Sequence, residues 1–138
     1  MTSAAPRRVL PAPTPETASF WTSGRDGRLR IQRCTQCEYY IHPPTPVCPR
    51  CGGRAVEPTV VSGHATVFAV TVNHQAWTPD LQVPYAMAIV ELPEQDGLRM
   101  STSIVGCPPD EVRIGMDVTV TFEDHDPLYL PMFAPSGS

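Results

Sequence analysis

The chain has 138 residues, of which 41% are hydrophobic and 17% are charged. This composition is typical of a folded globular protein and excludes a wholly disordered one. The length allows one compact domain, or a small module joined to a larger one. No apolar run approaches the roughly 20 residues of a transmembrane helix, and no hydrophobic signal segment follows the N-terminus. We therefore expect a soluble, cytoplasmic protein.

Charge divides the chain into two unlike halves. All ten basic residues are arginines, and residues 1–54 hold eight of them against three acids, a balance of +5. Residues 55–138 hold two arginines against eleven acids, a balance of −9. The basic half can meet phosphates or an acidic protein surface, while the acidic half repels a nucleic-acid backbone. The alternative that stays open is that these charges simply face solvent.

The N-terminal residues predict an extended lead-in followed by a short helix. Residues 1–13 are rich in Pro, Ala and Arg, a composition typical of extended or disordered segments. Thr14 can cap a helix, Pro15 suits its first position and Glu16 places an acid in its first turn. We expect the helix to start there and to end soon after Trp21.

In the second half of the chain the apolar residues follow the period of β-strands. Residues 64–74 form a long run that is apolar on both faces, as expected of a strongly curved strand shared by both halves of a small barrel. Residues 117–123 alternate strictly, with Val118, Val120 and Phe122 on the inward face. Two further strands are expected at residues 84–92 and 98–105.

These strands predict a mainly β fold. The last apolar stretch, residues 128–133, is expected to be an edge strand or a cover, because Pro127 and Pro131 make it a poor central strand. Four or five short strands without a long helical pattern favour a small Greek-key barrel of the OB-fold type, with a β-sandwich as the alternative. The expected units are a lead-in at 1–13, a helical segment at 14–28, a cysteine-containing ribbon at 29–56 and a barrel at 57–138.

Four cysteines form two C-x-x-C pairs, Cys34 with Cys37 and Cys48 with Cys51. Each pair allows a tight turn to direct two thiolates at one point, and two facing turns complete a tetrahedral site of four sulfur atoms. Gly52 follows the second pair and permits the positive-φ backbone that such a turn needs. The spacing predicts a structural metal site in a small ribbon, with zinc as the preferred ion.

Iron, disulfide bonds and thiol–disulfide chemistry are the alternatives to a zinc site. Iron stays open, because sites of four cysteines accept either metal. A disulfide framework is disfavoured in a chain without a secretory signal, and thiol–disulfide chemistry is disfavoured because glycines rather than a helix follow Cys51. Glu38 follows the first pair, where glycine is more usual, so the geometry of that turn is open. His42 is not needed as a ligand and Cys107 has no cysteine neighbour, so we interpret both as packing or surface residues.

Catalytic motifs are absent from the sequence. It has no G-x-S-x-G elbow, no H-E-x-x-H zinc motif and no glycine-rich phosphate loop. It also has no lysine, which excludes Schiff-base chemistry. A structural metal with four cysteine ligands has no open coordination position and does not catalyse hydrolysis. We therefore expect no enzymatic activity from the chain alone.

Five segments together resemble the DUF35 family of zinc-ribbon OB-fold proteins. They are TPETASFWTSGRDGRLRIQRCTQC, HPPTPVCPRCGG, VSGHATVFAVTVNH, PYAMAIVEL and GCPPDEVRIGMDVTVTF. The similarity runs from about Pro13 to Phe133, and Glu38 departs from the family pattern. The resemblance implies an N-terminal helical segment, a rubredoxin-like zinc ribbon and an OB-fold barrel.

The resemblance also implies a function in acyl-CoA metabolism. Members of the family are found beside thiolase-like enzymes and hydratases. Some form complexes with a thiolase-fold partner that carries the chemistry, including retro-aldol enzymes of steroid side-chain breakdown. We therefore expect a non-catalytic accessory subunit that binds and stabilises such an enzyme and helps to bind acyl-CoA. Two alternatives stay open: a nucleic-acid-binding module and a free-standing acyl-CoA-binding protein.

Two groups of side chains are candidates for contact with acyl-CoA or a partner. Trp77 lies in a polar loop with little core to join, which makes it the strongest aromatic candidate for a partner contact. Membership of the core is the alternative for each aromatic residue. The arginines expected to meet coenzyme A phosphates or acids on a partner are Arg28, Arg30, Arg33, Arg50 and Arg54. The aromatic residues expected to line an apolar surface or channel are Phe20, Trp21, Phe68, Trp77 and Tyr85.

Overall fold

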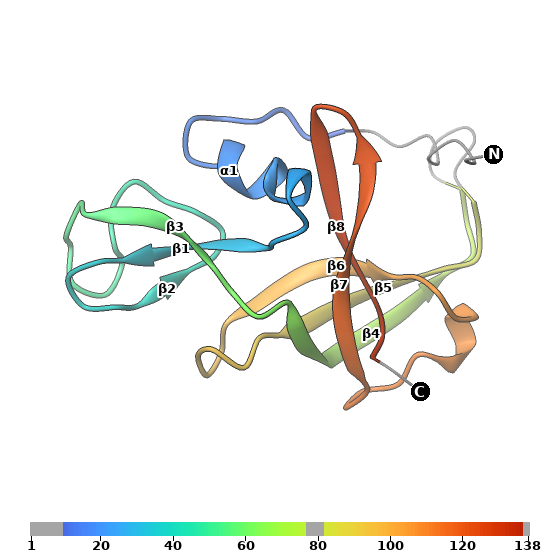
Figure 1. The fold of residues 1–138 in the computed structure, drawn as a ribbon. Helices are drawn as coiled ribbons and strands as arrows, with labels where there is room; N and C mark the ends of the chain where they lie inside the picture. The colour runs from blue at the N-terminus through green and yellow to red at the C-terminus, as the bar shows by residue number, and fades with distance from the viewer. Residues whose placement is uncertain (1–9, 77–81, 137–138) are drawn as a thin grey trace.

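The structure, a computed structural model, describes residues 10–76 and 82–136, so Trp77 lies outside the described residues. It contains a short N-terminal helical segment, a three-stranded ribbon and a closed five-stranded barrel (Figure 1). The mainly β architecture predicted from the sequence is confirmed, and the closed barrel excludes the sandwich. No helix among the described residues is both long and apolar enough to cross a membrane.

The helix starts later than predicted. Helix α1 spans Ala18–Trp21, and a 3₁₀ turn, η1, spans Ser23–Arg25. The Thr14 N–H donates to Thr17 Oγ1 at 2.8 Å, and the Thr17 N–H donates to the Thr14 carbonyl at 3.0 Å. The Thr17 N–H also lies 3.3 Å from Thr14 Oγ1, and the Ala18 N–H donates to the Thr14 carbonyl at 2.9 Å. Thr14 therefore caps a hydrogen-bonded turn at residues 15–17, and α1 follows this turn.

The ribbon is an antiparallel sheet with the strand order β2-β1-β3. Its strands are β1 Arg30–Cys34, β2 Tyr40–Ile41 and β3 Val56–Val60. β3 pairs with β1 along its full length, from Val56 opposite Cys34 to Val60 opposite Arg30. The ribbon sheet therefore continues past residue 56, where the predicted ribbon ends, before the chain turns into β4.

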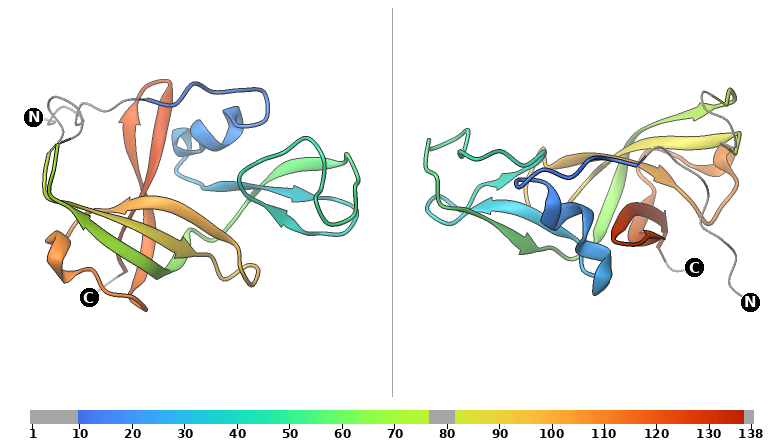
Figure 2. Two further views of the ribbon diagram at one scale, coloured as in Figure 1. Left: turned by 180° about the vertical axis from the view of Figure 1, so that it is seen from behind. Right: turned by 90° about the horizontal axis from the view of Figure 1, so that it is seen from above.

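The barrel closes in the order β4-β5-β6-β8-β7. Its inward residues form one hydrophobic cluster with Leu29 and Ile31 at the base of the ribbon and with Phe20 of α1. The helical segment, the base of the ribbon and the barrel therefore share one core, and Figure 2 shows the helical segment beside the junction of the two β units. The ribbon has a second cluster, formed by Cys34, Ile41 and Cys48. The strands are β4 His64–Asn73, β5 Tyr85–Glu91, β6 Arg99–Ile104, β7 Asp117–His125 and β8 Leu128–Pro135; a second 3₁₀ turn, η2, spans Pro109–Glu111.

A bulge in β4 explains why this strand is apolar on both faces. Its register against β5 shifts between Val67 and Ala69, with Phe68 at the irregularity. Val67 is buried in the core before the bulge, and Val70 packs against the same core after it. Phe68 is 46% exposed. The bulge adds one residue, so the residues that face inward switch from odd to even numbers there. The expectation that Phe68 and Val70 share a face is therefore wrong.

The prediction that residues 128–133 form an edge strand or a cover is wrong. β8 pairs with β7 along its whole length, and its Phe133 pairs in parallel with Ile104 of β6, which closes the barrel. Among the described residues this is the single ladder position between β6 and β8. Near Pro131 a side chain makes the link instead: the Thr102 hydroxyl donates to the Pro131 carbonyl at 3.0 Å. A proline is tolerated there because that link needs no N–H from β8.

Candidate functional site

The two C-x-x-C pairs come together at one point in the ribbon. Cys34 ends β1 and Cys37 lies in the turn to β2, while Cys48 and Cys51 lie in the loop between β2 and β3. The four Sγ atoms lie within 4.8 Å of one another, and the Cys34–Cys51 and Cys37–Cys48 Sγ distances are both 3.6 Å. Bonds of about 2.3 Å to a tetrahedral zinc ion place its sulfur ligands about 3.8 Å apart. The donor set therefore fits one such ion.

Both pairs lie on the same type of turn, although their sequences differ. The Glu38 N–H donates to the Cys34 carbonyl at 2.9 Å, and the Gly52 N–H donates to the Cys48 carbonyl at 2.9 Å. Gly52 has a φ of 76° and Glu38 a φ of 66°. Glu38 therefore adopts the left-handed conformation that glycine adopts without steric cost, and for a residue with a Cβ this costs about 1–2 kcal/mol. The departure from glycine preserves the geometry and carries strain.

The thiols of this cluster do not ionise alike. A main-chain N–H at Cys37, 3.5 Å from Cys34 Sγ, is the main cause that lowers the pKa of Cys34 to about 6. The pKa of Cys37 is lowered by a main-chain N–H at Tyr39, but burial and the thiols of Cys48, Cys51 and Cys34 raise it to about 12. Four thiolates this close together need a cation to offset their charge. A bound metal ion would supply that charge, and a zinc ion with four cysteine ligands would have a structural role.

His42 and Cys107 lie outside the donor set. The His42 ring packs against Phe20 with the ring centroids 4.9 Å apart, and burial lowers the pKa of the imidazole to about 4. Its Nδ1 atom is buried without a hydrogen-bond partner in the part of the chain that the structure describes. Cys107 lies beyond β6, where burial, followed by the charge of Glu111, raises its pKa. His42 thus serves packing between the ribbon and α1.

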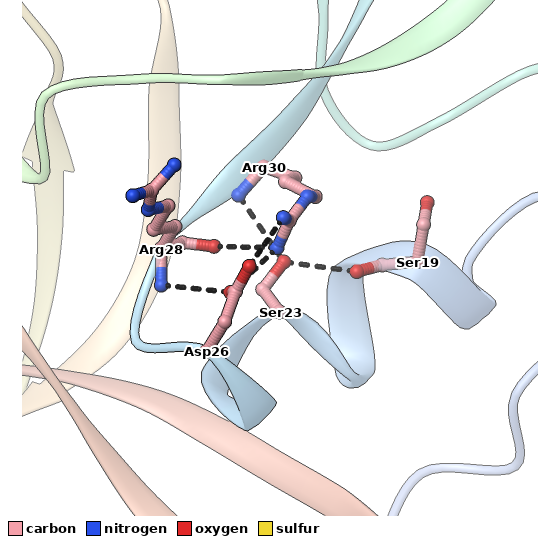
Figure 3. A network of polar contacts seen from close by, with 5 residues as sticks. All are labelled: Ser19, Ser23, Asp26, Arg28 and Arg30. Carbon is pink, nitrogen blue, oxygen red and sulfur yellow. Dashed lines mark hydrogen bonds and ion pairs between the residues drawn. The ribbon is translucent and has the colours of Figure 1, made fainter.

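Arg30, one of the five candidate arginines, pairs with a carboxylate of the chain (Figure 3). Arg30 makes two hydrogen bonds to the Asp26 carboxylate, at 2.9 and 2.7 Å, and the main-chain N–H of Arg28 donates to Asp26 at 3.3 Å. The hydrogen bond from the Arg30 side chain is the main cause that lowers the pKa of Asp26 to about 2. The buried Ser23 hydroxyl donates to the Ser19 carbonyl at 2.9 Å and accepts from the Arg30 N–H at 3.1 Å. This network fastens the helical segment to β1.

Two further arginines stack on tyrosine rings of the ribbon. The Arg33 guanidinium lies 4.7 Å from the centroid of the Tyr40 ring, and that of Arg50 lies 5.6 Å from the centroid of the Tyr39 ring. Arg33 Nε also donates to the Glu38 carbonyl at 3.0 Å. Stacking orients the guanidinium plane, and the N–H groups at the outer end of each guanidinium suit a phosphate or a carboxylate. The candidate arginines that are exposed are Arg28, Arg50 and Arg54.

The aromatic candidates divide between core and surface. Phe20 is 6% exposed and belongs to the core, and Trp21 packs edge-on against it with the ring centroids 4.8 Å apart. Phe68 lies on the outer side of the β4 bulge, with the Arg99 guanidinium 3.7 Å from its ring centroid. Tyr85 is half-buried at the start of β5. The core interpretation therefore holds for Phe20 and fails for Phe68.

Sequence reasoning missed Met87 and Ile89. They are 43% and 39% exposed on the outer face of β5, while Ala86, Ala88 and Val90 between and beside them face the core. The signal that could have found them is this alternation itself. A strand of a small barrel has one inward face, so the second set of apolar residues had to face outward.

Comparison with known proteins supports the division into ribbon and barrel. Residues 21–57 match the family model described as "ChsH2, rubredoxin-like zinc ribbon domain", and residues 59–123 match "ChsH2, C-terminal OB-fold domain". A chain of the solved structure "Ltp2-ChsH2(DUF35) aldolase" is 36% identical, with a TM-score of 0.83 over 93% of this chain and 100% of that chain. The chain belongs to the DUF35 family. The zinc ribbon and the OB-fold predicted from the sequence are therefore both confirmed.

Two curated relatives of this DUF35 chain are named as hydratase subunits. The "Probable enoyl-CoA hydratase alpha subunit" of Thermomonospora curvata is 38% identical over 94% of this chain and 40% of the relative. The "3-oxo-4,17-pregnadiene-20-carboxyl-CoA hydratase alpha subunit" of Mycobacterium tuberculosis is 37% identical over 84% of this chain and 36% of the relative. The chain thus spans about two fifths of the length of these relatives.

Proposed function

We propose that this chain is a non-catalytic accessory subunit that binds and stabilises a thiolase-like enzyme, a thiolase or a retro-aldolase, of acyl-CoA metabolism, steroid side-chain breakdown included. The observation that carries the proposal is the likeness of the chain, over 93% of its length, to the DUF35 chain named together with Ltp2 in an aldolase structure. The names of the two hydratase alpha subunits also support a role within an assembly.

The metal site supports a structural role rather than a catalytic one. Four cysteines fill the coordination sphere of a zinc ion, so no position is left for a substrate or a water molecule. Within residues 10–76 and 82–136, no other group of three or more His, Cys, Asp and Glu side chains is close enough to hold a metal ion. In this proposal the zinc ion stabilises the ribbon, and the partner supplies the catalytic residues.

We also propose that the ribbon arginines contribute to acyl-CoA binding at the assembled site. Arg28, Arg50 and Arg54 are exposed. Stacking on Tyr40 and a hydrogen bond from Nε to the Glu38 carbonyl orient the Arg33 guanidinium. Guanidinium groups suit the phosphates of coenzyme A because they donate two parallel hydrogen bonds. Arg30 contributes less, because Asp26 already occupies its guanidinium.

Co-expression with candidate partners tests the proposed function. The tagged chain is produced with a thiolase-like enzyme or with an enoyl-CoA hydratase, purified at moderate salt, and analysed by light scattering and metal analysis. A stoichiometric complex with a thiolase-like enzyme, in which this chain holds one zinc ion, is the expected result.

Two outcomes would contradict it. A chain that elutes alone and binds acyl-CoA by calorimetry would be a free-standing acyl-CoA-binding protein. Binding to single-stranded DNA that falls steeply with salt would indicate a nucleic-acid-binding module instead.

A further inference from the structure

An apolar patch covers the outer side of the barrel at β4 and β5. Met87 and Ile89 are exposed on β5, and Phe68 is exposed at the adjacent β4 bulge. Ile89 lies opposite Ser101 of β6. Because the serine side chain is small, it does not cover Ile89. Contiguous exposed apolar side chains on one sheet face are a mark of an interaction surface. Phe68, Met87 and Ile89 are called the outer patch below.

The patch continues into two grooves on either side of Trp21. A groove of about 540 Å³ runs from Met87 to β8, and a groove of about 440 Å³ runs from Ile89 to the loop after β2. Both are lined by Phe20, Trp21, Met100 and Ser101. Trp21, which is half-buried, therefore lines both grooves and connects them. A large aromatic residue that lines grooves beside an exposed apolar patch is a typical anchor of a protein interface.

Charges at the patch are neutralised within the chain. The Arg99 guanidinium lies over the Phe68 ring, and its Nε donates to Glu91 Oε1 at 2.9 Å. At the other end of β5, Asn73 Nδ2 donates to the Tyr85 hydroxyl at 2.6 Å. An apolar centre with polar pairs at its edge has the composition of a protein–protein interface. A partner therefore need not supply a charge to the centre of the patch.

The charge of the barrel half indicates which protein covers the patch. Residues 55–138 carry a balance of −9, so a second copy of this chain would bring two acidic barrels together, and nucleic acid would be repelled. An enzyme that binds the phosphates of coenzyme A carries basic groups at the mouth of its site. A basic rim around an apolar centre is complementary to an uncharged patch on an acidic barrel.

We propose that the outer patch and the Trp21 grooves are the docking surface for the acyl-CoA enzyme partner, at the basic surface around that partner's coenzyme A site. This inference rests on the proposed function and names the surface that performs it. The patch supplies the apolar contact that holds the complex together, and the acidic barrel speeds its formation.

A pair of matched variants tests the docking surface in the reconstituted complex. Ile89→Asp places a charge on the outer patch. Thr121→Asp places the same charge on an exposed position of β7, which pairs with β4 and β8 but not with β5. Ile89→Asp should weaken the affinity about tenfold or more, as a loss of about 1.4 kcal/mol at an interface anchor does. Thr121→Asp should stay within about twofold of the wild type, and the association rate of the wild type should fall as salt increases.

Hydrogen exchange of the wild-type complex is a second measurement, independent of whether a variant folds. Main-chain amides of β5 and β6 should exchange more slowly in the complex than in the free chain. Protection confined to the ribbon, or equal weakening by Ile89→Asp and Thr121→Asp, would overturn the docking surface while leaving the proposed function intact.

Three further outcomes separate the other possible occupants. Loss of acyl-CoA binding in Ile89→Asp, with enzyme binding retained, would show that the patch holds an acyl chain. A wild-type dimer that Ile89→Asp converts to a monomer would show that a second copy covers it. Either result contradicts the docking surface. A wild-type chain that binds no acyl-CoA enzyme would remove the proposed function and this inference together.

Discussion

The side-chain amide of Gln95 makes two hydrogen bonds with the main chain of Tyr40. The Tyr40 N–H donates to Gln95 Oε1 at 2.8 Å, and Gln95 Nε2 donates to the Tyr40 carbonyl at 3.0 Å. Tyr40 belongs to β2 of the ribbon, and Gln95 lies in the turn between β5 and β6 of the barrel. The amide takes the place of a neighbouring strand beside β2. Beside it, Glu94 Oε2 accepts a hydrogen bond from the Ser62 N–H at 2.7 Å, so one turn of the barrel binds the chain on both sides of the ribbon.

Replacing Gln95 with Ala should loosen the ribbon from the barrel. Both polar groups of Tyr40 lose their partner, which should lower the free energy of unfolding by about 1–3 kcal/mol. Urea unfolding measures this loss, and broadened ribbon signals in NMR spectra would locate it. The free energy of unfolding of Gln95→Glu should lie between those of the wild type and Gln95→Ala. A carboxylate accepts from the Tyr40 N–H but cannot donate to the Tyr40 carbonyl. Asp96→Ala, at an exposed position in the same turn, is the control and should change little.

Removing the backbone strain at Glu38, the left-handed residue after the first cysteine pair, should strengthen metal binding. Glu38 has a φ of 66° and Gly52 a φ of 76° in matching turns. We expect Glu38→Gly to raise the free energy of unfolding by up to about 1 kcal/mol and Gly52→Ala to lower it by at least about that amount. Competition with a zinc chelator should rank the three proteins in the same order. A weaker site in Glu38→Gly would mean that the Glu38 side chain stabilises the turn in another way.

Cys48→Ala should release the metal and disorder the ribbon while the barrel stays largely folded. Three thiolates cannot fill the coordination of a structural zinc ion, and a small metal module depends on its metal for folding. Bound zinc, measured by mass spectrometry, should fall from one ion to none, and only ribbon signals should lose dispersion in NMR spectra. Cys107→Ala is the matched control and should retain its zinc. A ribbon that keeps its full dispersion in Cys48→Ala would contradict the prediction.

The Asp26–Arg30 pair should make a pH-dependent contribution to stability. The pKa of Asp26 is lowered to about 2 in the folded chain, mainly by its hydrogen bond with Arg30, from an ordinary value of about 3.9. A lowered carboxylate pKa stabilises the fold above pH ~4, and this contribution disappears as the pH falls toward 2. In Arg30→Gln the carboxyl carbon of Asp26 should titrate near its ordinary value. The effect should be small and decrease with added salt, because Asp26 is exposed and Arg30 only half-buried.

Features that depend on residues close along the chain could be predicted from the sequence alone. Two C-x-x-C pairs at their spacing predict the metal site, because each pair needs only one tight turn. The alternation in residues 117–123 predicts β7 correctly, because the period of two is a local property of an extended backbone. The segments shared with the DUF35 family predict the order of helical segment, ribbon and barrel.

The tertiary structure decided what depends on residues far apart. The bulge that turns Phe68 outward appears only when β4 is paired with β5, and β8 closes the barrel in spite of Pro131 because its contact there with β6 is made by a side chain. Asp26 pairs with Arg30, so the Arg30 guanidinium is less available to a ligand. Gln95 is hydrogen-bonded to Tyr40, 55 residues away in the sequence. The conformational preferences of neighbouring residues do not predict such long-range contacts. Their free energy appears only once the packed core has brought the segments together and offset the loss of chain entropy.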